Sequence, residues 1–200
     1  MTALAKVDFR RSVSANEPAL VEADGAVFRA AMRQLASGVS VITHGVGAES
    51  AGLTATSVSS LSAEPPSLVV CVNRAASSYS GLVRGAPFGV SVLGADQQEI
   101  SDRFAGRTDL KGVERFRDGR WFVTPSGVRL LGGSAAAFEC EVEEILERHT
   151  HAIIVGGVRR AVASPVGGAL VYWRGAYDRL GWTADELSRA VGQTPRNASR

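Results

Sequence analysis

The sequence predicts a mainly β fold in which short strands form a barrel. About seven apolar segments of strand length recur along the 200 residues, and glycine or proline marks most turns between them. Only two or three segments show helical spacing, and long helices do not alternate with strands, which excludes a Rossmann-type parallel sheet. A chain of this length fits one domain with a full hydrophobic core.

Composition and charge exclude several classes of protein. The net charge is +2, with 22 basic and 20 acidic residues, and no basic run is interleaved with aromatic residues, so nucleic-acid binding is not predicted. No apolar run reaches the roughly 18 residues of a membrane-spanning helix, and the N-terminus lacks the apolar core of a signal peptide. Cys71 and Cys140 lie in separate apolar segments and are expected to be buried free thiols. A cytoplasmic protein without membrane contact is therefore the default expectation.

The N-terminal part of the chain is predicted to hold an arm, a helix and two strands. Residues 1–24 show no sustained periodicity and are expected to form a flexible arm. Asp24 can cap a helix from Gly25 to Ala36. The apolar residues of that helix share one face and are expected in the core: Val27, Phe28, Ala31, Met32 and Leu35. Strands are expected at Val39–Thr43 and Ala51–Val58, on either side of a glycine-rich turn.

The segment from Gly52 to Asn73 is unusually rich in hydroxyl groups. Between Thr54 and Ser62, six of nine residues carry a hydroxyl and none carries a charge. Pro65 and Pro66 stiffen a turn, and the β-branched run Ser67–Val72 is typical of a buried strand. Hydroxyls and backbone amides beside a strand suit a neutral, flat, hydrogen-bonding ligand better than a metal ion. A Ser/Thr-rich loop between two strands is the alternative.

A short polar segment after this strand is a candidate anion site. Ser77 or Ser78 can cap a helix from Tyr79 to Arg84, and Arg74 supplies a positive charge nearby. A helix N-terminus presents free amides that, with serine hydroxyls, suit an anion. A capped helix without a ligand is the alternative interpretation.

The middle of the chain is predicted to hold a strand, a helix and a charged loop. Phe88–Leu93 alternates as a strand, and Ala95–Phe104 has helical spacing with acidic residues on its outer side. Gly106–Arg120 crowds charges together and is expected to be a solvated loop, with a lid or a docking surface as the alternative. Two short apolar segments follow, Trp121–Val123 and Val128–Leu131.

Acidic residues alternate along the segment Ser134–Leu146. Its period of two places Glu139, Glu141 and Glu143 on one face of a strand. We expect a solvated face that resists edge pairing. A carboxylate acid–base site is the sharper alternative, but no second acidic cluster opposes these residues.

Two histidines and an aromatic segment follow. His149 and His151 precede a strand at Ala152–Val158, and side chains two apart on a strand point the same way, so a metal site is conceivable although no third ligand is identifiable. In the aromatic segment Ala169–Tyr177, Arg174 and Tyr177 suit a pyridine nucleotide by charge and stacking. The alternative is that Tyr172 and Trp173 belong to the core and Arg174 caps the barrel edge. Beyond Trp182 we expect a short helix from Thr183 to Leu187 and a polar, disordered end.

Four motifs follow one another along the chain: G-x-T-A-x-S, then S-x-x-P-P with an apolar run, then Ser77-Ser78, then Phe88–Leu93. In this order they resemble the flavin reductase family, and the resemblance covers about residues 25–181. These are small NAD(P)H:flavin oxidoreductases that serve two-component monooxygenases. Ala169–Tyr177 resembles the closing strand of the family, and Arg103-Phe104 resembles an element that reaches the bound flavin. The alternative for Arg103 is that it only suits a helix C-terminus electrostatically. His151 matches the histidine of the family's Gly-Asp-His element, whereas Thr150 replaces its aspartate.

The resemblance implies a split, Greek-key β-barrel that forms a homodimer and binds flavin near the subunit interface. It implies hydride transfer from NADH or NADPH to FAD or FMN, and delivery of reduced flavin to a partner monooxygenase. The cofactors would supply the reactivity, so no catalytic triad is expected. The chain would then consist of an arm (1–24), a flavin reductase-like domain (25–181) and a C-terminal tail (182–200).

The resemblance also implies roles for individual residues. His151 would be the catalytic residue, close to the nicotinamide. The flavin ring, ribityl chain and phosphate would be held by Ala55, Thr56, Ser57, Cys71, Val72, Asn73, Ser77 and Ser78, with Arg103 and Phe104 closing over them. The nicotinamide side would be lined by Ser50, Ala51, Gly52, Leu53 and Thr54, and by Tyr172, Trp173, Arg174 and Gly175. No metal is implied.

Two other functions remain open at this point. A non-catalytic flavin- or heme-binding barrel would keep the hydroxyl-rich segment but would need neither His151 nor Arg174. An enzyme that acts directly on an organic substrate would hold its flavin tightly and purify as a yellow protein. The sequence does not choose between FAD and FMN, between NADH and NADPH, or among partner oxygenases.

Overall fold

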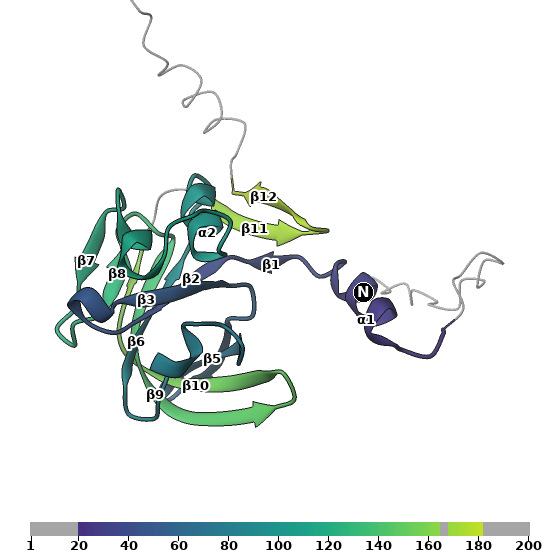
Figure 1. Ribbon diagram of the computed structural model, residues 1–200, viewed down its shortest axis with the longest axis horizontal. Helices are drawn as coiled ribbons and strands as arrows, with labels where there is room; N and C mark the ends of the chain where they lie inside the picture. Colours follow the sequence, from purple (N-terminus) through teal and green to yellow (C-terminus); the bar gives the residue numbers. More distant parts are fainter. Residues whose placement is uncertain (1–19, 165–167, 182–200) are drawn as a thin grey trace, which may run out of the picture. The chain divides into compact units, whose positions relative to one another are not determined.

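The computed structural model describes residues 20–164 and 168–181, so the predicted tail and most of the predicted arm lie outside the described residues. The described chain is mainly β, as predicted (Figure 1). Its strands are β1 (Ser37–Gly38), β2 (Ser40–His44), β3 (Ala51–Ala55), β4 (Ser59–Ala63), β5 (Pro66–Asn73), β6 (Pro87–Val92), β7 (Trp121–Val123), β8 (Arg129–Leu131), β9 (Ala136–Arg148), β10 (His151–Ala163), β11 (Ala169–Trp173) and β12 (Ala176–Leu180). The helices are α1 (Gly25–Met32) and α2 (Gln98–Phe104), with 3-10 turns η1 (Gly47–Glu49), η2 (Tyr79–Gly81) and η3 (Gly112–Phe116).

Helix α1 belongs to a separate compact unit that ends at Met32. Asp24 caps it as predicted, because its carboxylate accepts hydrogen bonds from the amides of Ala26 and Val27 at 2.7 and 2.8 Å. The same bonds, that of Val27 first, lower the pKa of Asp24. The helix is shorter than expected and none of its residues is buried, so the predicted core stripe is wrong. The chain leaves helical geometry after Met32 and pairs β1 with β11 instead.

The main sheet has seven antiparallel strands in the order β3-β2-β6-β9-β10-β5-β4. It curls, so that β2 and β3 form one side of the barrel and β5 and β10 the other (Figure 1). Within the described residues no strand ladder joins the outer strands β3 and β4, and the barrel is split there. The predicted strand Ala51–Val58 starts as β3 does but is too long, because the chain turns at residues 56–58 and returns as β4.

Two hydrophobic cores follow from the alternation of side chains along the strands. Inside the barrel, Ile42, Val70, Phe88 and Ile154 are fully buried. Their neighbours on the opposite face of β2 and β6 pack against α2, η3 and β11 in a second core, which consists of Val39, Val41, Leu93, Phe104, Phe116, Leu131 and Leu170. Helix α2 is therefore fixed on the outside of β2 and β3, next to the split.

The charged segment 106–120 is more ordered than predicted. It contains η3, and Phe116 is buried in edge-to-face contact with Phe104 and Trp121. The Arg103 guanidinium donates hydrogen bonds to the carbonyl oxygens of Arg115 and Arg117 and so ties α2 to this segment. The expectation of a solvated loop is wrong for Phe116, since an aromatic anchor holds the loop against the second core.

The glutamates of β9 do not form a uniformly solvated face. Glu139 is 2% exposed, pairs with Arg160 at 2.5 Å and accepts a hydrogen bond from the amide of Ser126. Glu141 is half-buried and Glu143 is exposed. The prediction is therefore wrong for Glu139, because the segment carrying Ser126 covers that end of the strand.

The predicted closing strand Ala169–Tyr177 is a hairpin instead. Strands β11 and β12 pair through a turn at Arg174 and Gly175, where φ is 52° and 89°. Two consecutive positive φ values are typical of the tight turns of hairpins, and glycine adopts them without strain. With β1 they form a three-stranded sheet.

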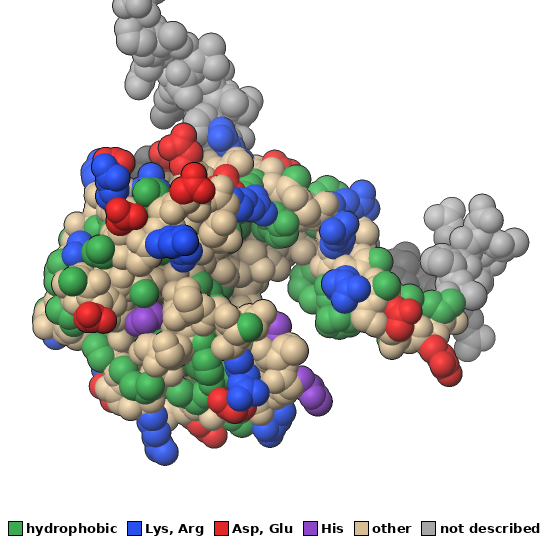
Figure 2. Space-filling view, in the orientation of Figure 1, with side chains coloured by type: hydrophobic (Ala, Val, Ile, Leu, Met, Phe, Trp, Pro, Cys, Tyr) green, Lys and Arg blue, Asp and Glu red, His purple; other side chains and the backbone are tan. Residues whose placement is uncertain are grey.

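Charged side chains of both signs lie on the surface of the described chain. On the face shown in Figure 2, acidic and basic side chains are interspersed rather than segregated into a patch of one sign. Across the described part of the chain, neither helix has the length and apolar character needed to span a bilayer.

Candidate functional site

A pocket of about 510 Å³ lies at the split of the barrel. Its walls come from β3 with the turn after it, from the end of β5, from the segment before η2, from the end of α2 and from the start of β10. The sequence prediction named most of its lining, namely Gly52–Ser57, Cys71, Asn73, Ser77, Ser78, Phe104 and His151. The remaining lining residues are Ala76, Ala105, Gly106 and Arg115. No carboxylate is among them.

The hydroxyls of the β3 wall differ in how firmly they are held. Thr54 Oγ1 donates to the carbonyl of Ser101 in α2 at 2.7 Å. Ser57 Oγ donates to the carbonyl of Cys71 at 2.8 Å and accepts from the amide of Cys71 at 3.2 Å, which holds the turn onto β5. Thr56 is exposed at the pocket and has no hydrogen-bond partner among the described residues. Thr56 is thus the hydroxyl on this wall that remains available to a ligand.

The segment from Asn73 to Ser78 forms a second wall. Asn73 Oδ1 accepts a hydrogen bond from the amide of Ala75 at 2.9 Å and shapes the turn after β5. Ser78 is 3% exposed and donates to the carbonyl of Gly52 at 2.8 Å, whereas Ser77 is exposed. The predicted helix Tyr79–Arg84 is wrong, since only the 3-10 turn η2 forms. Ser77 therefore faces the pocket without the helix end that the sequence suggested.

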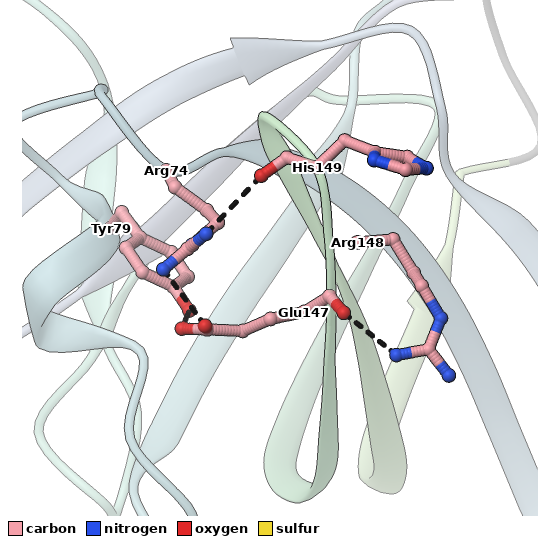
Figure 3. Close-up of polar contacts among 5 residues, drawn as sticks. All are labelled: Arg74, Tyr79, Glu147, Arg148 and His149. Atoms are coloured by element: carbon pink, nitrogen blue, oxygen red, sulfur yellow. Dashed lines mark hydrogen bonds and ion pairs between the residues drawn. The ribbon is translucent and has the colours of Figure 1, made fainter.

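Arg74 does not supply the positive charge of this pocket. Figure 3 shows its guanidinium turned toward the β9–β10 hairpin, where it pairs with Glu147 at 2.8 Å and donates to the carbonyl of His149 at 3.2 Å. Glu147 also accepts a hydrogen bond from the Tyr79 hydroxyl at 2.8 Å, which raises the pKa of Tyr79 (Figure 3). This cluster clamps the wall segment to the hairpin and neutralises Arg74.

His151 is the first residue of β10 and lines the pocket. It is paired with Asn73 of β5, and its side chain is exposed. The Thr150 hydroxyl lies 2.8 Å from its Nδ1, so threonine contacts this nitrogen where the family's aspartate is replaced. His149 lies in the hairpin turn with φ of 50°, so the two imidazoles do not share a strand face. The described residues hold no group of three His, Cys, Asp or Glu side chains placed to bind a metal.

Arg115 is the one charged residue among the four lining residues that the sequence interpretation missed. It belongs to the charged segment that was expected to be solvated, and it is half-buried at the pocket. Phe116, an aromatic residue inside a run of charges, was the signal that this segment is anchored. The same anchor brings the neighbouring Arg115 to the pocket wall.

Several predicted contacts lie away from this pocket. Val72 is 1% exposed inside the barrel, because Cys71 and Asn73 occupy the alternate face of β5. Ser50 is buried and accepts a hydrogen bond from Arg129 at 3.2 Å, and Ala51 lines a neighbouring cavity. Neither residue is among those that line the pocket at the barrel split.

Tyr172, Trp173, Arg174 and Gly175 also lie outside the pocket wall, on β11 and its turn. Trp173 Nε1 donates to the carbonyl of Gln34 at 3.1 Å, and Arg174 stacks 4.4 Å from the Trp173 ring. Arg103 is likewise turned to the loop after α2. A nicotinamide role for the β11 residues stays a prediction.

Comparison with known proteins gives consistent matches. The sequence model of the flavin reductase like domain matches residues 32–181. A curated relative, the FMN reductase (NADH) RutF of Methylorubrum extorquens, is 37% identical over 168 residues, which is 82% of this chain and 80% of that protein.

Solved structures give the same result. The Streptomyces globisporus C-1027 NADH:FAD oxidoreductase SgcE6 superposes with a TM-score of 0.75 and 30% identity, over 84% of this chain and all of that one. It has also been solved in complex with NAD and FAD fragments. BorF, the flavin reductase component of a bacterial two-component tryptophan halogenase, has a TM-score of 0.71 and 34% identity, over 78% of this chain and 98% of its own.

Proposed function

The chain belongs to the flavin reductase family, and from this premise we propose that it is an NAD(P)H-dependent flavin oxidoreductase. Its reaction is hydride transfer from NADH or NADPH to FMN or FAD. The relatives named above are NADH-dependent with FMN or FAD, which supports flavin and NADH as the pair to test first.

The pocket at the barrel split is the observation that carries this proposal. It offers apolar surface from Leu53 and Phe104, an available hydroxyl on Thr56, and backbone groups along β3 and at Asn73. A large, flat ring with polar edges needs this combination of apolar faces and a few hydrogen-bonding groups. The exposed Ser77 and the cation Arg115 fit a phosphate-bearing tail, and no lining carboxylate would repel it.

The residues of the pocket orient the reactants. When bound, the nicotinamide supplies a hydride and the flavin ring accepts it. The β3 wall and Phe104 define one position for the flavin ring, and His151 lies at the rim of the pocket. Thr150 contacts Nδ1 of His151, whereas Nε2 has no protein partner among the described residues. His151 thereby offers a ring nitrogen to the nicotinamide carboxamide or to a water at the mouth.

Three further features belong to the proposal. The reduced flavin is passed to a partner monooxygenase, a role supported by the two-component system of BorF. The protein acts as a cytoplasmic homodimer, and sedimentation equilibrium should give twice its mass of 21.0 kDa. Tyr172 and Trp173 of β11, with Arg174 and Gly175 of the turn after it, then contribute to the nicotinamide side.

A two-part assay tests the function. Flavin fluorescence titrations with FMN and FAD give the two affinities, and loss of nicotinamide absorbance with each flavin gives turnover with NADH and with NADPH. Flavin binding without oxidation of the nicotinamide nucleotide would contradict the proposal and would indicate a non-catalytic flavin carrier. Heme binding without flavin binding would leave a heme protein, and a protein that purifies with stoichiometric flavin would be an enzyme with its own organic substrate.

A further inference from the structure

A second cavity, of about 440 Å³, adjoins the pocket at the barrel split. Ser77 is the one residue that lines both cavities, so they meet at its side chain. The walls of the second cavity come from the end of β2, from the turns η1 and η2 and from the start of β6. The reaction described above uses the pocket at the split and leaves this second cavity without a role.

The second cavity combines apolar walls with a few free hydroxyl groups. Its apolar surface comes from Val46, Ala86 and Pro87. Ser77 and Ser80 are exposed, and within the described residues neither hydroxyl has a hydrogen-bond partner. Apolar walls with a few polar groups are typical of small-molecule sites, whose volumes run from about 300 to 1,000 Å³. The cavity therefore has the size and the lining of a ligand site.

The only carboxylate that lines the second cavity is that of Glu49. Glu49 is exposed, and none of the ion pairs found in the described part of the chain includes it. His44 also lines the cavity and is 8% exposed; burial lowers the pKa of its imidazole, and a hydrogen bond with the backbone of Ser78 opposes this only in part. The imidazole is therefore neutral at neutral pH, and the cavity presents an acceptor carboxylate without a cation. Such a site favours a group that donates hydrogen bonds and carries no negative charge.

The two adjoining cavities are opposite in charge. The pocket at the split contains the cation Arg115 and no carboxylate, whereas the second cavity contains Glu49 and no Lys or Arg. A dinucleotide has an anionic middle and a neutral nucleoside at its end. The hydroxyls of a ribose donate hydrogen bonds to a carboxylate, as in other dinucleotide sites, and a purine ring fits apolar walls. We propose that the second cavity binds the adenosine half of a dinucleotide whose reactive half occupies the pocket at the split, with Glu49 accepting hydrogen bonds from the ribose.

This inference rests on the proposed function and adds a preference between flavins to it. FAD and NADH both carry adenosine. The shared residue Ser77 favours FAD, because the phosphate-bearing tail of the flavin is placed at Ser77 and the adenosine of FAD continues from that tail. FMN ends at its phosphate and cannot reach the second cavity. We expect FAD to bind about 10-fold more tightly than FMN, the effect of one hydrogen bond to a charged group.

The test compares the wild type with Glu49→Gln, Ser80→Phe and the matched control Glu144→Gln. Ser80 lines the second cavity alone, so a phenyl ring there fills it without entering the pocket at the split. Glu144 is exposed and lines neither cavity, so its variant has the same charge change without the contact. FAD and FMN are titrated without nicotinamide nucleotide, and the KM for NADH is measured separately with FMN. In Glu49→Gln and Ser80→Phe the FAD affinity falls about 10-fold, to that of FMN. The FMN affinity stays unchanged, and Glu144→Gln behaves as the wild type.

FMN serves as the internal check on pocket integrity. Equal losses for FAD and FMN in Glu49→Gln would mean that Glu49 only supports the turn after β2, and would overturn the inference. A raised KM for NADH in both variants, with unchanged FAD affinity, would support the adenosine site and assign it to the nicotinamide nucleotide. If the variants change neither the FAD affinity nor the KM for NADH, the inference fails, while turnover of NADH with FMN or FAD keeps the proposed function. If the wild type binds neither flavin, both fail.

Discussion

At the scale of single residues, His151 depends on its neighbour for orientation. Thr150 contacts Nδ1 at 2.8 Å, and the side chain reaches the pocket from the first position of β10. We expect His151→Ala to slow hydride transfer by about 10- to 100-fold, since loss of a positioning contact changes the alignment of the reactants. Flavin affinity should stay near the wild-type value. Stopped-flow traces of nicotinamide oxidation measure the first effect and a flavin titration the second.

His149→Ala is the matched control for that experiment. His149 lies in the adjacent hairpin turn and does not line the pocket. Its variant should react at the wild-type rate. Equal rates in both variants and the wild type would remove His151 from the mechanism.

The two serines of the pocket segment should respond differently to substitution. Ser78→Ala removes a buried hydrogen bond to Gly52 and should lower the free energy of unfolding by about 1 kcal/mol. Ser77→Ala removes an exposed hydroxyl, so stability should be unchanged while FMN affinity falls by about 1–2 kcal/mol. Thermal unfolding and flavin titration of both variants separate the two roles, and the reverse pattern would exchange them.

Glu139 should make stability depend on pH in the acid range. Burial alone raises the pKa of its carboxyl group, but hydrogen bonds from Ser126, Arg160 and Thr124 outweigh it and lower the pKa to about 2. A lowered pKa contributes stability that is present above the unfolded value near 4.5 and is lost as the pH falls toward 2. With allowance for the exposed Arg160, we expect a loss of about 2 kcal/mol over that window.

The acid dependence can be assigned with two variants. Glu139→Gln should be less stable at neutral pH and should lose part of the pH dependence between about 4.5 and 2. Glu144→Gln removes an exposed carboxylate of the same strand and should retain it. Urea unfolding at several pH values gives the comparison; parallel curves for Glu139→Gln and the wild type would contradict the assignment.

At the scale of elements, the barrel interior limits what β10 tolerates. A Cβ added to Gly156 would lie 2.3 Å from Cζ of Phe88, a ring that is fully buried. We therefore expect Gly156→Ala to destabilise the protein by about 1–3 kcal/mol through overpacking. Gly38→Ala is the control, since a Cβ at Gly38 meets nothing within 4 Å. Thermal unfolding of the two variants should differ clearly, and equal stabilities would mean that Phe88 repacks without cost.

Strand segments with clear alternation could be placed from the sequence, whereas their ends could not. Phe88–Leu93 was predicted nearly as observed in β6, because alternation and burial agree there. The strand at Ala51–Val58 was predicted too long, because the turn depends on a hydrogen bond between Ser57 and the distant Cys71. The hairpin within Ala169–Tyr177 was predicted as a single strand, because Gly175 is the only residue of the segment whose type indicates a turn.

The burial of the two cysteines could be predicted from the sequence for one of them only. Cys71 was expected to be buried because its segment is apolar, yet it is exposed. Its neighbours Val70 and Val72 point into the barrel, so Cys71 must point out at the pocket. Cys140 is buried as expected, and burial, followed by the charge of Glu139, raises the pKa of its thiol to about 12.

At the scale of the whole molecule, the candidate site arises from the strand order. Strands β3 and β5 are separated by five positions in the sheet order, yet both line one pocket because the sheet curls and stays open between them. No local pattern in the sequence predicts that these two strands meet at one pocket. The split-barrel fold and twelve of the residues that line the pocket were predicted from the family resemblance. It did not supply Arg115, which reaches the pocket through the packing of Phe116 on the second core.

The exposure of Cys71 gives the protein a built-in reporter. It is the one exposed cysteine in a chain of two, and its side chain lies on the pocket wall while Cys140 is enclosed. A maleimide dye should therefore attach at a single place, and its rate of attachment should drop when a ligand fills the split. Occupancy of the site could then be followed without any turnover, one molecule or one candidate ligand at a time.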